Sequence, residues 1–317
     1  YRRNFETDSI QMAIERITPK FLAPLAANAW FMSPPCQPYT RTGKMLDEKD
    51  ARAKGLIHLI GLLGRMPSPP TYIFLENVLN FEKSRSRDLL IRQLTRLGYD
   101  FTEWLLTPLQ FGIPNDRVRY FLTARRRAPS PSGEVSPPEW VSPPLDLRRD
   151  WPWSAQYGSI PPVGDYLEPE VDADAFRVPD TFVKKRRGFS ETVLAKPTDT
   201  RTSCFTKAYG HHGLGAGAFV QTRGFDVSYV GCFKRMQSPE FFTPTEIARL
   251  HAFPIDGASP TPPPARPSAP ARHAFAFPDT LSTVQRWRVL GNSMNVKVVG
   301  ELMRCALFGS DEWGGAV

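Results

Sequence analysis

The feature that most constrains the fold is an alternation of short apolar segments and amphipathic segments over residues 29–123. Four apolar runs are typical of strands: residues 29–32, 72–75, 101–106 and 118–123. Two longer segments carry apolar side chains at helical spacing: residues 50–65 and 86–97. This alternation predicts an open, mostly parallel, doubly wound α/β sheet. Ligands of such sheets bind beyond the carboxyl ends of the strands, here at residues 33–37 and at Glu76-Asn77, where the second strand is expected to stop.

Capping residues indicate where several helices begin and end. The helix over residues 86–97 is expected to start at Ser86, and Gly98 lies just past its end. Residues 243–246 and 282–285 both have the spacing of a capping box, which predicts a helix start at each place. The last helix is predicted to have a single apolar face, formed by Val296, Val299, Leu302, Met303 and Ala306.

Proline divides the chain into blocks. Of the 32 prolines, ten lie between residues 128 and 169 and eight between residues 254 and 278. Residues 260–270 are so rich in proline that we expect an extended surface insertion, because proline cannot join helix or sheet ladders. We therefore expect a first domain over residues 1–127 and a smaller one over residues 128–281. The helices of residues 282–317 are expected to return to the first domain.

Charge and cysteine content narrow the function classes. The net charge is +8, and the sequence pI is near 9.4. This balance fits a polyanionic partner such as nucleic acid, or a basic protein that has no such partner. No run of 18 apolar residues is present, so we expect no membrane span. Four scattered cysteines form no C-x-x-C pair, and this indicates a reducing compartment, cytoplasmic or nuclear.

Cys36 is the first candidate for chemistry. It follows a predicted strand and is flanked by Pro35 and, after Gln37, by Pro38, so the backbone would present its thiol rigidly. A thiolate there could act as a nucleophile. A buried structural cysteine is the alternative interpretation.

Glu76, Arg117 and Arg119 are further candidates. A carboxyl group at the end of a buried strand would be desolvated, which favours its protonated form and makes Glu76 a proton donor; a surface or capping acid is the alternative. Arg117 and Arg119 lead into the strand at residues 118–123, and strand alternation predicts that both lie on one face. They suit phosphate or carbonyl contacts, although a solvated basic pair is the simpler reading.

The order and spacing of these motifs resemble the cytosine-5 methyltransferase family, and more closely its tRNA-modifying branch, which was historically grouped with DNA methyltransferases. Three segments carry the narrower resemblance: residues 32–41 (MSPPCQPYTR), 112–121 (GIPNDRVRYF) and 204–210 (CFTKAYG). Residues 242–247 (FTPTEI) and 290–296 (LGNSMNV) match as well. The resemblance covers nearly the whole chain except the proline-rich segments.

The resemblance implies roles for individual residues. Cys36 matches the nucleophile that adds to C6 of cytosine, and Glu76 matches the residue that holds and protonates N3. Arg119 matches the arginine on the O2 side, with Arg117 nearby. Other residues are implied as support on the substrate side: Gln37, Asn77, Cys204, Phe205 and Thr206. The implied substrate is an anticodon-loop cytosine of tRNA, which must leave its stack to react.

The cofactor implied by the resemblance is S-adenosylmethionine. Its expected contacts in this chain are Ser33, Pro34, Gly55, Leu56, Asn292 and Ser293. The family also has a Gly-rich turn and a ribose-binding acid near its start, and neither is present in this sequence. Residues 1–5 align just beyond that acid, so we expect a Rossmann-like sheet that lacks its first strand–helix unit and binds the cofactor weakly.

Other functions remain open at this point. A DNA cytosine-5 methyltransferase shares the catalytic motifs, and a catalytically dead nucleic-acid-binding protein fits the absent cofactor motif. A cysteine hydrolase is disfavoured because none of the five histidines stands out as a base for Cys36, and no metal-ligand spacing is present. We expect a monomer that binds tRNA or DNA.

Overall fold

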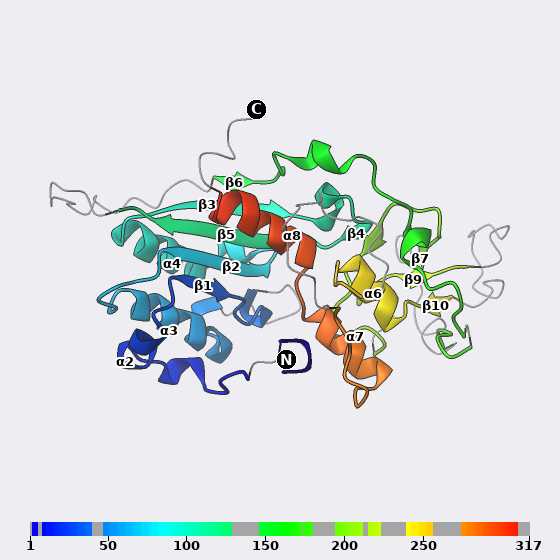
Figure 1. The fold of residues 1–317 in the computed structure, drawn as a ribbon, viewed down its shortest axis with the longest axis horizontal. Coiled ribbons are helices and arrows are strands. Elements are labelled where there is room, and N and C mark those ends of the chain that lie inside the picture. Colours follow the sequence, from blue (N-terminus) through cyan, green and yellow to red (C-terminus); the bar gives the residue numbers. More distant parts are fainter. Residues whose placement is uncertain are drawn as a thin grey trace. The chain divides into compact units, whose positions relative to one another are not determined.

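The structure is a computed structural model that describes residues 2–5, 8–39, 47–128, 146–172, 174–179, 194–211, 215–222, 239–255 and 274–309 (Figure 1). The chain forms two compact units, and each has its own hydrophobic core. Unit 1 comprises Tyr1–Ser9, Thr107–Arg117 and Pro152–Gly300. Unit 2 comprises Ile10–Leu106, Val118–Trp151 and Glu301–Val317.

Unit 2 is built on a five-stranded sheet of order β1-β2-β5-β3-β6. Its strands are β1 (Ala29–Met32), β2 (Tyr72–Val78), β3 (Tyr99–Leu106), β5 (Arg119–Arg126) and β6 (Leu147–Arg148). The pairs β1–β2 and β3–β6 are parallel, whereas β5 runs antiparallel to both β2 and β3. The α/β prediction is confirmed, but the sheet is mixed rather than mostly parallel. Only the 3-10 helix η7 (Pro108–Phe111) and the two-residue strand β4 (Asn115–Asp116) lie between β3 and β5, and a parallel pair would need a longer crossover.

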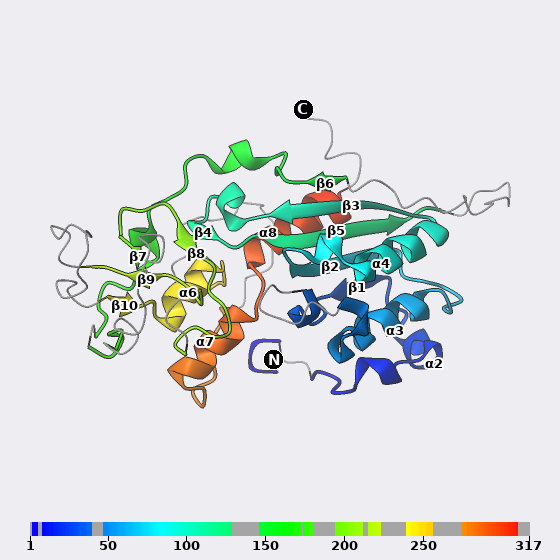
Figure 2. The same cartoon turned by 180° about the vertical axis from the view of Figure 1, so that it is seen from behind.

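Helices cover both faces of this sheet (Figures 1 and 2). Helices α3 (Lys54–Leu63) and α4 (Arg85–Arg96) pack on one face, and the C-terminal π-helical turn η12 (Leu302–Leu307) contacts β2 and β5 on the other. Smaller elements of unit 2 are η1 (Ile14–Arg16), α2 (Pro19–Leu22), η2 (Ala23–Leu25), η3 (Gln37–Tyr39), η4 (Asp47–Lys49), η5 (Ala51–Ala53) and η6 (Phe81–Lys83).

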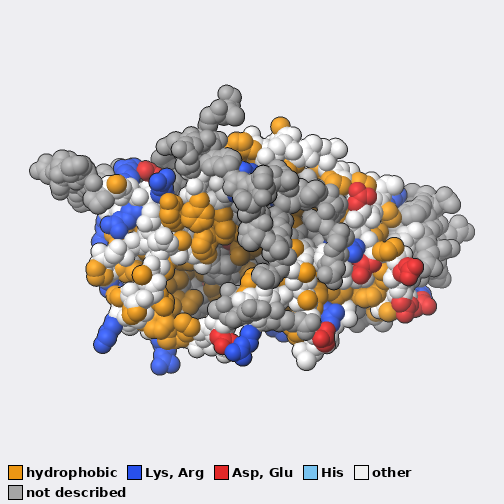
Figure 3. Space-filling view, viewed as in Figure 1, with side chains coloured by type: hydrophobic (Ala, Val, Ile, Leu, Met, Phe, Trp, Pro, Cys, Tyr) orange, Lys and Arg blue, Asp and Glu red, His pale blue; other side chains and the backbone are white. Residues whose placement is uncertain are grey.

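Strand alternation explains the two faces. Ile73 and Leu75 of β2 are fully buried in the core that also contains side chains of α3 and α4. Phe74 points to the other face, where its ring centroid lies 5.9 Å from that of Phe31. Phe31 is 48 % exposed and Phe308 45 % exposed, and Figure 3 shows hydrophobic side chains gathered on this face. Within the described residues, β1 pairs with no strand other than β2.

The first turn of α4 corrects one predicted boundary. The N-cap is Ser84 rather than Ser86, because the Ser84 side chain accepts a hydrogen bond from the Arg87 backbone N–H at 3.0 Å. Ser86 instead donates its hydroxyl to Asp47. The predicted helix end is confirmed, since Gly98 follows the helix with a φ of +73°.

Unit 1 contains short strands and helices around an aromatic core. Strands β4 (Asn115–Asp116) and β8 (Thr202–Ser203) are parallel, and a second sheet has the order β10 (Glu240–Phe241), β9 (Phe219–Val220), β7 (Leu194–Ala195). Besides η7, the described helices of this unit include α1 (Arg2–Phe5), η8 (Ser154–Tyr157), η9 (Val163–Tyr166), α6 (Pro244–Leu250) and α7 (Thr283–Gly291). Both predicted capping boxes are confirmed at the starts of α6 and α7.

The C-terminal helices differ from the prediction. Helix α7 belongs to unit 1, because Trp287 and Leu290 are buried in that core, and the chain enters unit 2 only at Glu301. Helix α8 (Val296–Glu301) continues directly into the π-helical turn η12. The predicted apolar face is also wrong at Val296, which is 41 % exposed while Val298 is buried. The buried Val298 and Leu302 lie four residues apart on one helix face, and Val296 is the first residue of α8, off that face.

Two sequence features lie outside the described residues, namely the proline-rich segment 260–270 and Cys232. In the part of the chain that is described, no helix is long and apolar enough to span a bilayer.

Candidate active site

Cys36 lies in unit 2 on a short loop held at the carboxyl end of β1. The thiol is half-buried, and the Cys36 carbonyl accepts a hydrogen bond from the Tyr39 N–H at 3.0 Å, within the 3-10 helix η3. The loop is anchored to β2, because Asn77 Nδ2 donates to the Pro34 carbonyl at 3.3 Å. The buried Tyr39 ring packs edge-on against Phe81 at 4.9 Å. These contacts fix the backbone on both sides of the thiol.

Glu76 lies inside β2, not beyond its end as predicted. The strand continues to Val78 because β5 supplies partners for its last residues; Glu76 pairs with Phe121 and Asn77 with Tyr120. Glu76 is buried, with only 8 % of the residue exposed. Ser33 Oγ donates to one carboxylate oxygen at 2.7 Å, and Arg119 Nε lies 3.5 Å from the other.

Ser33, Pro34, Glu76, Asn77 and Arg119 therefore lie together in unit 2 beside the Cys36 loop. Gln37 is half-buried in the same loop. A nucleophilic sulfur, a buried carboxyl group and a guanidinium near one strand edge can act together on a planar heterocycle with an amide-like edge.

Arg52 is a residue that the sequence analysis missed. Its guanidinium is held by Asp50, with Nε 2.9 Å from Oδ1 and Nη2 2.6 Å from Oδ2. The hydrogen bond to Asp50 is the main cause that raises the pKa of Arg52, and the charge of Cys36 adds to it. The spacing Asp50-x-Arg52, soon after the cysteine loop, was the sequence feature from which the contact between Asp50 and Arg52 could have been predicted.

Arg117 has a different environment from the one predicted. Its guanidinium is buried in unit 1, where Nη1 donates to Cys204 Sγ at 3.1 Å and to the Phe205 carbonyl at 2.8 Å. Nη2 donates to the carbonyls of Gly291 at 3.2 Å and Ser293 at 2.5 Å. The expectation that Arg117 and Arg119 share one strand face is wrong, because β5 begins only at Arg119 and alternation does not extend back to Arg117.

Arg117 thereby joins two segments of unit 1 that the sequence singled out separately. Gly291 packs directly on the Cys204-Phe205-Thr206 segment, and a Cβ atom built there would overlap backbone atoms of Thr206 and Lys207. Phe205 is 1 % exposed and belongs to the core of unit 1. Cys204 is half-buried, and its thiol faces the Arg117 guanidinium.

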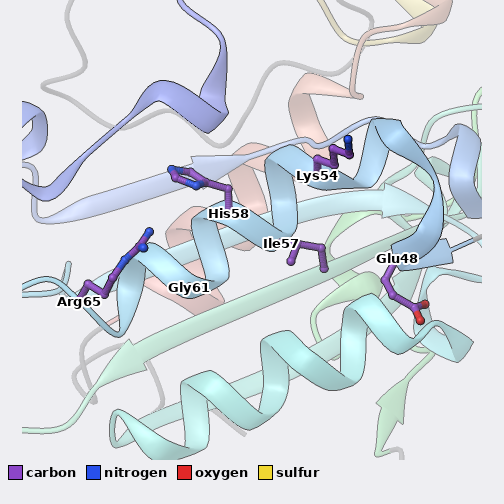
Figure 4. Close-up of a pocket in the computed structure, with 6 residues that line it drawn as sticks. All are labelled: Glu48, Lys54, Ile57, His58, Gly61 and Arg65. Carbon is purple, nitrogen blue, oxygen red and sulfur yellow. The ribbon is translucent and has the colours of Figure 1, made fainter.

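Among the surface hollows that the described residues of unit 2 form, two are lined by charged side chains and by none of Cys36, Glu76 and Arg119. One, of about 370 Å³, is formed by Glu48, Lys54, Ile57, His58, Gly61 and Arg65. Figure 4 shows the Lys54 and His58 side chains projecting from helix α3 and the Arg65 side chain from the turn that follows it. The His58 ring is fixed by a 2.7 Å hydrogen bond from Nε2 to the Ile17 carbonyl. The other hollow, of about 550 Å³, lies at the start of α4, where Lys83, Arg85 and Arg92 line it.

Comparison with known proteins decides the family. A family profile described as C-5 cytosine-specific DNA methylase matches residues 1–306. The chain belongs to the cytosine-5 methyltransferase family. It is a methyltransferase enzyme, and proteins of this family generally use S-adenosylmethionine.

Individual relatives agree with this assignment. The bovine (Bos taurus) tRNA (cytosine(38)-C(5))-methyltransferase is 31% identical, over 96% of this chain and 88% of that protein. A DNA (cytosine-5)-methyltransferase of Dictyostelium discoideum is 30% identical, over 98% of this chain and 85% of that protein. A crystal structure of Spodoptera frugiperda DNMT2 superposes with a TM-score of 0.72 at 30% identity, over 96% of this chain and 86% of that one.

The residues expected to contact the cofactor differ in how accessible their side chains are to a ligand. Ser33 of unit 2 and Asn292 of unit 1 are exposed, so their polar groups are accessible to a ligand. Leu56 is 1 % exposed in the core of unit 2, and Gly55 is buried against Ile14, so both residues serve packing. The Ser293 hydroxyl donates to the Leu290 carbonyl at 2.6 Å. The Ser33 and Asn292 side chains and the neighbouring half-buried Pro34 fit a cofactor contact, and a contact by Gly55, Leu56 or Ser293 stays a prediction.

Proposed function

We propose that this chain methylates C5 of a cytosine in RNA, with an anticodon-loop cytosine of tRNA as the favoured target, through a covalent adduct at Cys36. The observation that carries the proposal is the grouping of the Cys36 loop with Glu76, Ser33 and Arg119 in unit 2. The relatives named for tRNA cytosine methylation support it.

The first step makes C5 reactive. The Cys36 sulfur adds to C6 of the base and forms an S–C6 bond, while the C5–C6 electron pair shifts toward C5 and N3. Glu76 holds a proton at N3 and so accommodates the electrons withdrawn from C6. Ser33 donates a hydrogen bond to one oxygen of this carboxyl group at 2.7 Å, and Arg119 Nε lies 3.5 Å from the other oxygen. Together the two contacts orient the carboxyl group. Covalent addition divides one difficult step into two easier ones.

The second step transfers the methyl group. S-adenosylmethionine, when bound, supplies an electrophilic methyl group on its sulfonium. The C5 electron pair forms a bond to this methyl group as the methyl–sulfur bond breaks, so S-adenosylhomocysteine leaves and C5 carries both a hydrogen and the new methyl group. A base removes the C5 proton, the electrons re-form the C5–C6 double bond, and the S–C6 bond breaks to release Cys36 as a thiolate. Arg119 is proposed to hold the O2 side of the base throughout.

RNA is favoured over DNA on two grounds. The Cys204-Phe205-Thr206 segment resembles the tRNA-modifying branch, and a loop nucleotide is already partly unstacked, which lowers the cost of extracting it. DNA methylation is the second candidate, because the Dictyostelium relative carries that name.

Side-by-side methylation assays test this choice. Radiolabelled S-adenosylmethionine is supplied with an unmodified tRNA mixture or with duplex DNA, at equal nucleotide concentration. We expect methyl incorporation into tRNA cytosine and little into DNA. Incorporation into DNA at a higher rate than into tRNA would contradict the RNA assignment and leave the family assignment intact.

A further inference from the structure

A basic hollow lies at the start of helix α4 in unit 2. Its volume is about 550 Å³, and it is lined by Asp47, Lys83, Arg85, Asp88, Leu89 and Arg92. The Lys83, Arg85 and Arg92 side chains are exposed. The hollow therefore combines three cations with two carboxylates at the molecular surface.

Both carboxylates are already engaged by groups of the protein. Asp47 accepts hydrogen bonds from the backbone N–H groups of Arg85 at 2.5 Å and Ser86 at 3.2 Å, and from the Ser86 hydroxyl at 2.7 Å. Asp88 lies 3.1 Å from the buried Arg87 guanidinium. These contacts neutralise the two carboxylates of the hollow. The Arg85 side chain is 72 % exposed and forms a 3.6 Å ion pair with Glu48, which leaves it open to a further anion.

The same contacts exclude the helix terminus as an anion site. Because Asp47 caps the first N–H groups of α4, a further anion in the hollow must be held by side chains. Lysine and arginine suit phosphate oxygens in this role. The charge excess of the hollow is thus complementary to phosphate.

The hollow also lies close to the elements that carry the candidate catalytic residues. Lys83 ends the 3-10 helix η6, which follows β2 and therefore Glu76. The first residue of η6, Phe81, packs on Tyr39 of the Cys36 loop at 4.9 Å. Asp47, which also lines the hollow, begins the 3-10 helix η4 that comes after that loop in the sequence. A nucleic acid whose base reaches Cys36 would carry its neighbouring phosphates past this surface.

We propose that this hollow is a phosphate-binding subsite for the RNA backbone beside the target cytosine. The proposal rests on the proposed function and deepens it. Lys83 and Arg85 contact backbone phosphates, carry no base specificity, and act on binding rather than on the chemical step.

A double substitution tests the subsite, namely Lys83→Ala with Arg85→Ala. Binding of an anticodon stem-loop RNA is measured by fluorescence anisotropy over a range of salt concentrations, without turnover. Each lost phosphate contact lowers the slope of log K against log salt by about 0.7 for single strands, so we expect a total decrease of about 1.4. KM for the RNA should rise about tenfold at unchanged kcat, because neither side chain touches the reacting base.

The matched control is Arg65→Ala with Arg96→Ala. Arg65 follows the C-terminal end of α3, and Arg96 is the last residue of α4. Both are exposed, and the two substitutions remove the same charge as the test variant does. We expect the control to keep the wild-type salt slope. An unchanged slope in the Lys83/Arg85 variant, or an equal decrease in the control, would overturn the subsite. A DNA hairpin of the same sequence is measured in parallel, and a slope change confined to DNA would also overturn it. Failure of the proposed function would show separately, as absent methylation of RNA by the wild-type chain.

Discussion

At the scale of single residues, the candidate site depends on one buried carboxyl group. Glu76 is contacted by Ser33 on one oxygen and by Arg119 near the other, so its orientation is fixed before any substrate arrives. A group held this way can serve a proton at a defined atom without reorganising.

The substitution Glu76→Gln tests this role. The amide keeps the shape of the side chain but cannot transfer the proton at N3. We expect methyl transfer to fall by about 100-fold or more, the usual contribution of a general acid or base. RNA affinity should stay within about threefold, because phosphate contacts supply most of it.

The control for this variant is Glu82→Gln. Glu82 is also buried, and its carboxylate accepts a hydrogen bond from the Asn80 N–H at 2.7 Å. Methyl transfer by the Glu82 variant should stay near wild type. Equal losses in both variants would mean that the Glu76 change acts through general destabilisation.

At the scale of elements, the arrangement of unit 1 relies on a close backbone approach at the end of α7. Gly291→Ala would place a methyl group inside the backbone of Thr206 and Lys207. We expect the free energy of unfolding to fall by at least about 2 kcal/mol, the scale of overpacking in a filled core. Urea denaturation followed by circular dichroism measures it.

Gly300→Ala is the matched glycine substitution in helix α8, because no atom lies within 4 Å of a Cβ atom built there. Replacing this helical glycine should be neutral or stabilise the chain by up to about 1 kcal/mol. If the Gly291 variant were as stable as the Gly300 variant, the contact between α7 and residues 204–207 would be wrong.

The capping box of α6 predicts a pH dependence. Burial is the main cause that raises the pKa of Glu246 to about 7, although the N–H groups of Glu168 and Thr243 oppose it. A raised pKa favours the protonated form in the folded state, so its stabilisation is complete below the ordinary value of 4.5 and is lost as pH rises toward 7. The free energy of unfolding should fall over this interval by at most about 1.4 kcal/mol per pH unit.

Unfolding of the Glu246→Gln variant, measured at several pH values, isolates this contribution. Glutamine keeps a capping-box acceptor but does not titrate. The wild type should lose stability relative to the variant between pH 5 and pH 7, because this range lies between the ordinary pKa of 4.5 and the raised pKa of about 7. Parallel pH profiles for the two proteins would contradict the assignment.

Elements with a clear period were predictable from sequence, and contacts between distant segments were not. The apolar runs predicted β1, β2, β3 and β5 because strand burial dictates their composition. The extension of β2 through Glu76 and Asn77 was missed, since polar residues signal a strand end unless a partner strand is known. The hydrogen bonds of the Arg117 guanidinium could not be predicted either, because its acceptors lie 87 to 176 residues away in sequence.

At the scale of the whole molecule, two cores support two sets of motifs. Unit 2 carries Cys36, Glu76 and Arg119, and unit 1 carries Arg117 with the Cys204-Phe205-Thr206 segment and the Gly291 turn. The order of motifs along the chain gave the family, which the profile match over residues 1–306 confirms. The division of the chain between units could not be predicted in the same way, because residues 107–117 leave unit 2 between two of its adjacent strands.

Covalent trapping tests the central claim most directly. A stem-loop RNA with 5-fluorocytosine at the target position cannot lose a proton from C5, so the S–C6 bond should persist after methyl transfer. With S-adenosylmethionine present, the wild type and the Cys305→Ala control should form an adduct that survives denaturing electrophoresis, and peptide mass analysis should assign it to Cys36. The Cys36→Ala variant should form none. An adduct formed by the Cys36→Ala variant, or mapped to Cys204, would contradict the account.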